Sequence, residues 1–210
     1  MSRTAEQHRG VGVSTGAALV VSQGIEWLWH HLSDITNPHV LDCGPASPST
    51  IRILLDRQAK FYSADLITSL YKSDPTLWDR SGKTPVFLAD KLLTELPLIP
   101  EGSLSAILSW NLLDLTPHEG LQRVVNRLFG LLRPLGILFA VLHEPQHKTG
   151  VESRWWLEAL SSPRNEADGQ KAFPYGAVTN REIERLLPAA SIKTFLTRSG
   201  RREILAMRRP

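Results

Sequence analysis

The chain of 210 residues contains a single cysteine, Cys43, so it can form no intramolecular disulfide and has no cysteine cluster for a zinc site. Long apolar runs are also missing. The longest one near the N-terminus, residues 17–21, is too short for the core of a signal peptide or for a membrane-spanning helix. These absences predict a cytoplasmic protein, in a reducing compartment, without a metal site or a membrane contact.

Neither sign of charge dominates. There are 24 lysines and arginines against 21 aspartates and glutamates, for a formal net charge of +3. So small an excess does not by itself predict a nucleic-acid-binding protein. Hydrophobic residues make up 42% of the chain, enough for one compact domain with a sizeable core. We expect residues 1–36 to form an N-terminal tail and helix, and residues 37–210 to form the single domain.

Short apolar runs typical of buried strands alternate with segments of helical periodicity. The predicted strands are residues 39–44, 60–65, 85–90, 104–110, 137–142, 191–196 and 203–208. The predicted helices are residues 22–35, a helix opened by Ser47 and Pro48, residues 118–132, and a helix opened by a capping box at Thr179. This order predicts a doubly wound, mostly parallel, seven-stranded α/β sheet with an antiparallel C-terminal edge hairpin and helices on both faces. Residues 144–177 fit no clear pattern beyond a helix expected around Trp155 and Trp156. We expect this pair of tryptophans to serve packing, with a lid over the site as the alternative.

Four of the predicted parallel strands end in residues suited to ligand binding. Gly44, Asp65, Asp90 and Trp110 stand at or just beyond these ends. In doubly wound sheets the carboxyl ends of the strands form one edge, and ligands bind there. A glycine after a strand lets the backbone approach a ligand closely, and a strand-end carboxylate accepts hydrogen bonds from hydroxyl groups. The sequence therefore predicts a ligand site at this edge.

The order of these features resembles the class I S-adenosylmethionine (SAM) methyltransferase family. Residues 40–44 are similar to its first motif, a strand followed by a glycine-rich loop. Residues 105–111 resemble its fourth strand with the following loop, and residues 132–136 resemble its Leu-Lys-Pro-Gly-Gly turn before strand five. The resemblance implies a Rossmann-like fold with SAM as cofactor, Asp65 on the ribose hydroxyls and Asp90 near the adenine. The cofactor-binding residues that it implies are Asp42, Gly44, Ala46, Asp65, Asp90, Ser109 and Trp110.

The first loop departs from the family pattern. The family usually reads Gly-x-Gly-x-Gly, and this chain reads Gly44-Pro-Ala-Ser-Pro48. Ala46 adds a methyl group, and the two prolines remove two N–H donors. A second interpretation is therefore a catalytically inactive, methyltransferase-like binding or scaffold protein. On that view Asp42 and Asp65 cap helix N-termini, Gly44 serves only the turn, and Asp90 pairs with its neighbour Lys91 on the surface.

Methyl transfer requires mainly proximity and in-line orientation, so no catalytic cluster is needed. His143 and Glu144 follow the strand 137–142 toward the predicted site and are the candidates for a general base. The family motif Asn/Asp-Pro-Pro-Tyr/Phe is replaced by residues 111–114, Asn-Leu-Leu-Asp, which argues against methylation of an amino group on a base or glutamine. We expect a small-molecule acceptor, or a protein partner if the chain is inactive. Nucleic-acid modification is a third hypothesis, supported only by the arginines of residues 198–209.

Overall fold

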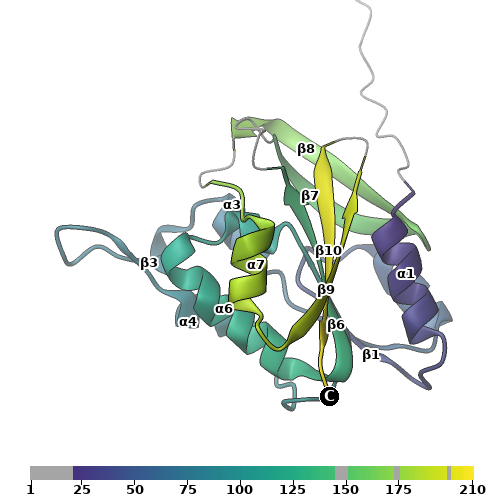
Figure 1. The fold of residues 1–210 in the computed structure, drawn as a ribbon. Coiled ribbons are helices and arrows are strands. Elements are labelled where there is room, and N and C mark those ends of the chain that lie inside the picture. The colour runs from purple at the N-terminus through teal and green to yellow at the C-terminus, as the bar shows by residue number, and fades with distance from the viewer. Residues whose placement is uncertain (1–20, 145–150, 173–175, 198–199) are drawn as a thin grey trace, which may run out of the picture.

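The computed structural model describes residues 21–144, 151–172, 176–197 and 200–210, and its centre is a six-stranded sheet in the order β2-β1-β5-β6-β10-β9 (Figure 1). The strands are β1 (His39–Asp42), β2 (Lys60–Ser63), β5 (Leu104–Trp110), β6 (Leu132–His143), β9 (Ala190–Leu196) and β10 (Arg201–Arg208). The first four strands in this order run parallel, and β10 is antiparallel to both β6 and β9. The predicted α/β fold class and its C-terminal edge hairpin are confirmed, with six strands in the sheet instead of seven.

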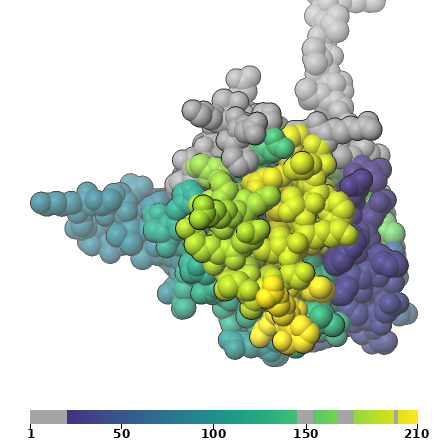
Figure 2. All heavy atoms as spheres, in the orientation of Figure 1, coloured from purple at the N-terminus to yellow at the C-terminus, as the bar shows by residue number. Residues whose placement is uncertain are grey.

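The predicted strand 85–90 is wrong. Within it, β4 (Val86–Phe87) pairs with β3 (Trp78–Asp79) in a separate two-stranded hairpin, and the chain then enters α4 (Ala89–Leu93). Phe87 explains why no strand of the main sheet forms here, because its buried ring packs on Gly120 of the helix 118–131. A Cβ atom at Gly120 would lie 2.3 Å from the Phe87 ring. The apolar residues after Phe87 follow the spacing of a helix. The hairpin loop projects from the body (Figure 2), and β2 becomes an edge of the main sheet.

Helices cover both faces of the sheet, with α1 on one side and α6 and α7 on the other (Figure 1). The helices besides α4 are α1 (Gln23–Leu32), α2 (Pro48–Asp56), α3 (Ile67–Tyr71), the 3₁₀ turn η1 (Pro75–Leu77), α5 (Leu112–Leu115), α6 (His118–Leu131) and α7 (Asn180–Leu186). The predicted caps at Ser22 and Thr179 are confirmed: the Ser22 side chain accepts from the Ile25 amide, and Thr179 with Glu182 forms the capping box. Within the described residues, no helix combines the length and apolarity needed to cross a bilayer.

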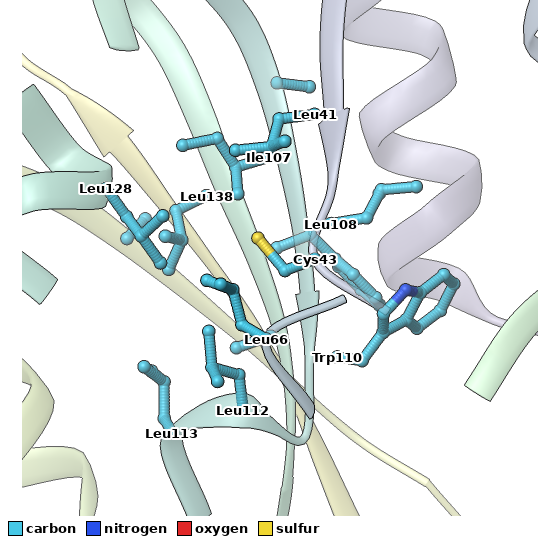
Figure 3. Packing of buried hydrophobic residues seen from close by; sticks show 14 of the residues in the cluster. Leu41, Cys43, Leu66, Ile107, Leu108, Trp110, Leu112, Leu113, Leu128 and Leu138 are labelled. Atoms are coloured by element: carbon cyan, nitrogen blue, oxygen red, sulfur yellow. The ribbon is translucent and has the colours of Figure 1, made fainter. Parts of the chain in front are cut away.

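The core lies between the sheet and these helices. One face of α6 is buried, and each of its leucine and valine side chains stabilises the fold by roughly 1.5–3 kcal/mol. Cys43 is fully buried among apolar side chains (Figure 3), and its burial raises the pKa of the thiol. The core thereby fixes the carboxyl ends of β1 and β5 side by side.

The expected helix around Trp155 and Trp156 is also wrong, because this segment is a β-hairpin of β7 (Val151–Ala159) and β8 (Ser162–Ala172). Burial alternates along β7: Trp155 and Leu157 are buried, and Trp156 and Glu158 are half-buried. That two-residue period is typical of a strand with one covered face. The adjacent tryptophans conceal it in the sequence, since both are large and apolar.

A pair of glycines on α6 tests the placement of Phe87. Gly120→Ala should lower the free energy of unfolding by about 1–3 kcal/mol, because the new methyl group overlaps the Phe87 ring. Gly130→Ala on the same helix meets no atom within 4 Å and should raise the free energy of unfolding by about 0.5–1 kcal/mol. Urea unfolding of both variants measures the difference. Equal effects would contradict the packing of Phe87 on α6.

Candidate functional site

The carboxyl ends of β1, β2 and β5 meet at one edge of the sheet, as the sequence predicts. Asp42 ends β1 and Trp110 ends β5, while Gly44 and Asp65 follow β1 and β2 by two residues. Asp42 contacts both Gly44 and Trp110, and the charge of Asp65 acts on Asp42. We call these four residues, Asp42, Gly44, Asp65 and Trp110, the Gly44 edge.

Asp42 is a carboxylate removed from water, with only 1% of its surface exposed. One of its oxygens, Oδ1, accepts hydrogen bonds from the Gly44 amide at 2.9 Å and from the Trp110 indole N–H at 2.7 Å. Burial raises the pKa of Asp42 to about 6; the two hydrogen bonds oppose this shift, and the nearby charge of Asp65 adds to it. No lysine or arginine forms an ion pair with Asp42 or Asp65 in the part of the chain that the structure describes.

Trp110 covers Gly44. Its indole lies so close that a Cβ at Gly44 would stand 2.9 Å from the ring atom Cδ1, so glycine is required there by the protein itself. Trp110 is fully buried and has φ = 48°, in the left-handed region, which costs about 1–2 kcal/mol for a residue other than glycine. The indole points away from Leu66, Leu112 and Leu113, which gather on the other side of the strands (Figure 3).

A second tryptophan, which sequence reasoning did not assign to the site, lies over the first. Trp155 of β7 stacks on Trp110 with 6.5 Å between the ring centroids and 10° between the planes. Phe139 meets Trp110 edge-on at 5.9 Å, and the Arg201 guanidinium lies 4.7 Å from the Trp155 ring centroid. Burial also lowers the pKa of Arg201. The alternation along β7 is the only sequence signal that could have brought Trp155 to this edge.

Asp65 caps the short helix α3. Its Oδ1 accepts from the amides of Ile67 at 3.2 Å and Thr68 at 2.9 Å, and its Oδ2 accepts from the Thr68 hydroxyl at 2.6 Å. The capping alternative is therefore realised for Asp65, whereas Asp42 accepts from the Gly44 amide and the Trp110 indole and caps no helix. Oδ2 keeps the capacity for one more hydrogen bond, because a carboxylate oxygen can accept two.

The structure places the other predicted cofactor residues differently. Asp90 lies exposed on α4 and therefore does not end a strand of the main sheet, as its expected place near the adenine required. Its carboxylate forms an ion pair with Arg123 at 2.6 Å, and not with Lys91 as the surface alternative expected. Ser109 is buried, and its hydroxyl donates to the Phe139 carbonyl inside the sheet. Ala46 is exposed in the loop before α2. Ser47 precedes α2 as predicted, but its side chain makes no capping bond.

His143, a candidate base, ends β6 beside a buried carboxylate that the sequence did not reveal. The fully buried Asp114 side chain on α5 accepts from the backbone amide of His143 at 2.8 Å and lies 2.7 Å from its ring atom Nδ1. Such a carboxylate fixes the orientation of an imidazole. The buried guanidinium of Arg202 donates to the carbonyls of His143 and Val178, which ties β10 to this cluster. The other candidate, Glu144, is half-buried just beyond β6.

Two cavities lie away from the Gly44 edge. One of about 360 Å³ is lined by the ends of α1 and α2, including Trp29 and Arg57, and one of about 300 Å³ lies between α6 and α7 beside Arg208. Among the described residues, no three His, Cys, Asp or Glu side chains are grouped to hold a metal ion.

Asp42 makes stability depend on pH. In the folded chain the pKa of Asp42 is about 6, above its ordinary value of 3.8. The stability that its protonated carboxyl group contributes is therefore fully present below pH 4 and is lost as the pH rises through 6, a loss of about 3 kcal/mol. Asp42→Asn removes the charge and keeps an oxygen for both donors. Its free energy of unfolding relative to the natural chain should therefore rise between pH 4 and 7.5 in urea titrations. Asp56→Asn on the surface of α2 controls for the substitution, and a pH-independent difference for Asp42→Asn would contradict the burial of its charge.

No protein-family model and no curated protein matches the chain. Solved structures do. A SAM-dependent methyltransferase from Clostridium acetobutylicum superposes with a TM-score of 0.52 at 10% identity, covering 89% of this chain and 91% of that one. One from Mesorhizobium loti gives a TM-score of 0.50 at 14% identity, covering 88% and 98%. At such identities the likeness concerns the fold. The chain has the fold of the class I SAM-dependent methyltransferases.

Proposed function

We propose that the chain binds SAM at the Gly44 edge and transfers its methyl group to a small-molecule acceptor. The observation that carries the proposal is the buried carboxylate of Asp42, which is bonded to two neutral donors and lies near a second carboxylate, Asp65. An uncompensated buried charge is costly and favours a ligand of opposite sign. SAM carries a positive sulfonium and a positive ammonium group, and when bound it supplies an electrophilic methyl group.

The residues of the edge fit such a ligand in part. Gly44 permits close approach of the backbone, and Asp65 Oδ2 can accept one further hydrogen bond from a ribose hydroxyl. Against the fit, Pro45 and Pro48 offer no N–H donors, and the Trp110 indole fills the space in front of Gly44. Trp110 must therefore move when a ligand enters.

For an acceptor atom that carries a proton, we propose His143 as the base, with Asp114 as its positioning residue, because the Asp114 carboxylate lies 2.7 Å from His143 Nδ1. The other candidate, Glu144, is the next residue along the chain and is half-buried just beyond β6. An acceptor that is already unprotonated needs neither group, because transfer from a sulfonium depends on in-line placement.

The second candidate function, a catalytically inactive binding protein, is favoured by the Trp110–Trp155 stack over Gly44. A nucleic-acid acceptor loses support, because the described arginines of the C-terminal strand are largely engaged within the protein. Arg202 binds backbone carbonyls, Arg208 donates to Leu132, and Arg201 covers Trp155. Arg198 lies outside the described residues.

Calorimetric titration with SAM and with S-adenosylhomocysteine (SAH) tests the proposal. The natural chain should bind SAM with a dissociation constant in the micromolar range. Asp65→Asn should weaken binding about tenfold or more, because a charge-assisted hydrogen bond contributes about 1.5–3 kcal/mol. Asn can still accept the amide hydrogen bonds that open α3, so the variant separates ligand binding from folding.

Asp79→Asn is the matched control, since Asp79 accepts the Ser81 amide in an exposed turn of the projecting hairpin. It should leave the affinity for SAM unchanged. No heat and no thermal shift with either ligand at millimolar concentration would reject SAM binding and leave the inactive binding protein as the function.

A further inference from the structure

We propose that the β7–β8 hairpin is a plug: Trp155 holds Trp110 on Gly44, and a ligand enters the Gly44 edge only when Trp155 withdraws. The ligand part of this inference rests on the proposed binding of SAM. The plug itself rests on contacts within the chain.

The first support is the layering at the edge. Trp110 lies on Gly44, Trp155 stacks on Trp110, and the Arg201 guanidinium lies over Trp155. Trp155 is 7% exposed, so this stack closes the edge from the side of the hairpin. Stacked aromatic pairs and cation–π contacts contribute on the order of 1 kcal/mol each beyond the buried area. A closure of this strength is reversible.

The second support is how the hairpin is attached. β7 and β8 pair with each other and not with the main sheet. The hairpin is bonded to the body through the Leu157 amide, which donates to the Thr50 hydroxyl at 2.9 Å, and through its turn, whose carbonyls at Leu160 and Ser161 accept from Trp29 and Ser22. The partners in these bonds are Thr50 of α2, Trp29 of α1 and Ser22 at the start of α1, and Figure 1 shows α1 beside one end of the hairpin. The hairpin can therefore lift without breaking a strand pair of the main sheet.

The third support is the state of Trp110. Its indole N–H occupies Asp42, the same carboxylate that a cationic ligand would neutralise, and its backbone is held in the left-handed region. Strained backbone at such positions persists only where the surroundings impose it. Trp155 and Phe139 contact the Trp110 indole from two sides, and its N–H is bonded to Asp42. The closed arrangement and a bound ligand therefore compete for Asp42 and for the space in front of Gly44.

The neighbouring Trp156 provides a matched control. It lies on the other face of β7, where its indole N–H donates to Glu158 at 2.8 Å and the Arg164 guanidinium lies 5.9 Å from its ring centroid. Trp156 is half-buried and stacks on no residue of the Gly44 edge. Removing either tryptophan takes the same number of atoms from the same strand.

Titration of the variants with SAM and SAH tests the plug. Trp155→Ala should bind both ligands about tenfold or more tightly than the natural chain, because the apparent dissociation constant falls as the open fraction rises. Trp156→Ala should bind within about twofold of the natural chain. An affinity of Trp155→Ala equal to or weaker than that of the natural chain would overturn the plug while leaving SAM binding intact.

Hydrogen exchange in the natural chain without ligand tests the plug independently of any variant or cofactor. The Leu157 amide should exchange through an opening with a much lower free energy than the amides of β5 and β6, and the Gly44 amide should share that opening. Exchange of Leu157 only by global unfolding would overturn the plug whatever SAM does. A low-energy opening combined with no binding by any variant would uphold the plug and reject SAM as the ligand.

Discussion

The carboxylate of Asp42 is the constraint on which the functional edge depends. It is buried at the end of β1, and its oxygen Oδ1 joins the Gly44 amide and the Trp110 indole at one point. This geometry requires glycine at position 44, holds Trp110 in the left-handed region and presents an indole face to Trp155. A charge kept at such cost is expected where a ligand uses it, since an asparagine could make the same bonds without the penalty.

Much of the fold could be predicted because local patterns and tertiary packing agree there. The strand Leu104–Trp110 is mostly apolar and buried throughout, α6 has one buried stripe, and the caps at Ser22 and Thr179 are local hydrogen bonds. The expected strand 85–90 failed because Phe87 finds its partner, Gly120, in a helix over thirty residues away. The period of β7 was concealed by its adjacent tryptophans.

The residues of the candidate site also fall into those that the sequence predicted and those that it did not. Asp42, Gly44 and Trp110 could be found from the sequence because parallel strands bring their carboxyl ends together. Asp65 was found too, although it caps a helix as well as facing the edge. Asp114 was missed, and Trp155 was expected only in packing or in a lid. The contacts of these two residues with His143 and Trp110 are encoded in no spacing. The expected position of Asp90 was wrong because the strand 85–90, at whose end it was predicted, does not form.

In this chain a methyltransferase fold carries an edge that two of its own tryptophans close. The indole N–H resonance of Trp110, identified with Trp110→Phe, is the most direct probe of that closure by nuclear magnetic resonance. This resonance should follow the titration of Asp42 near pH 6 in the free protein, and it should shift or broaden when SAM is added. A Trp110 resonance that neither titrates with Asp42 nor responds to SAM would contradict both the closure and the binding of SAM at this edge.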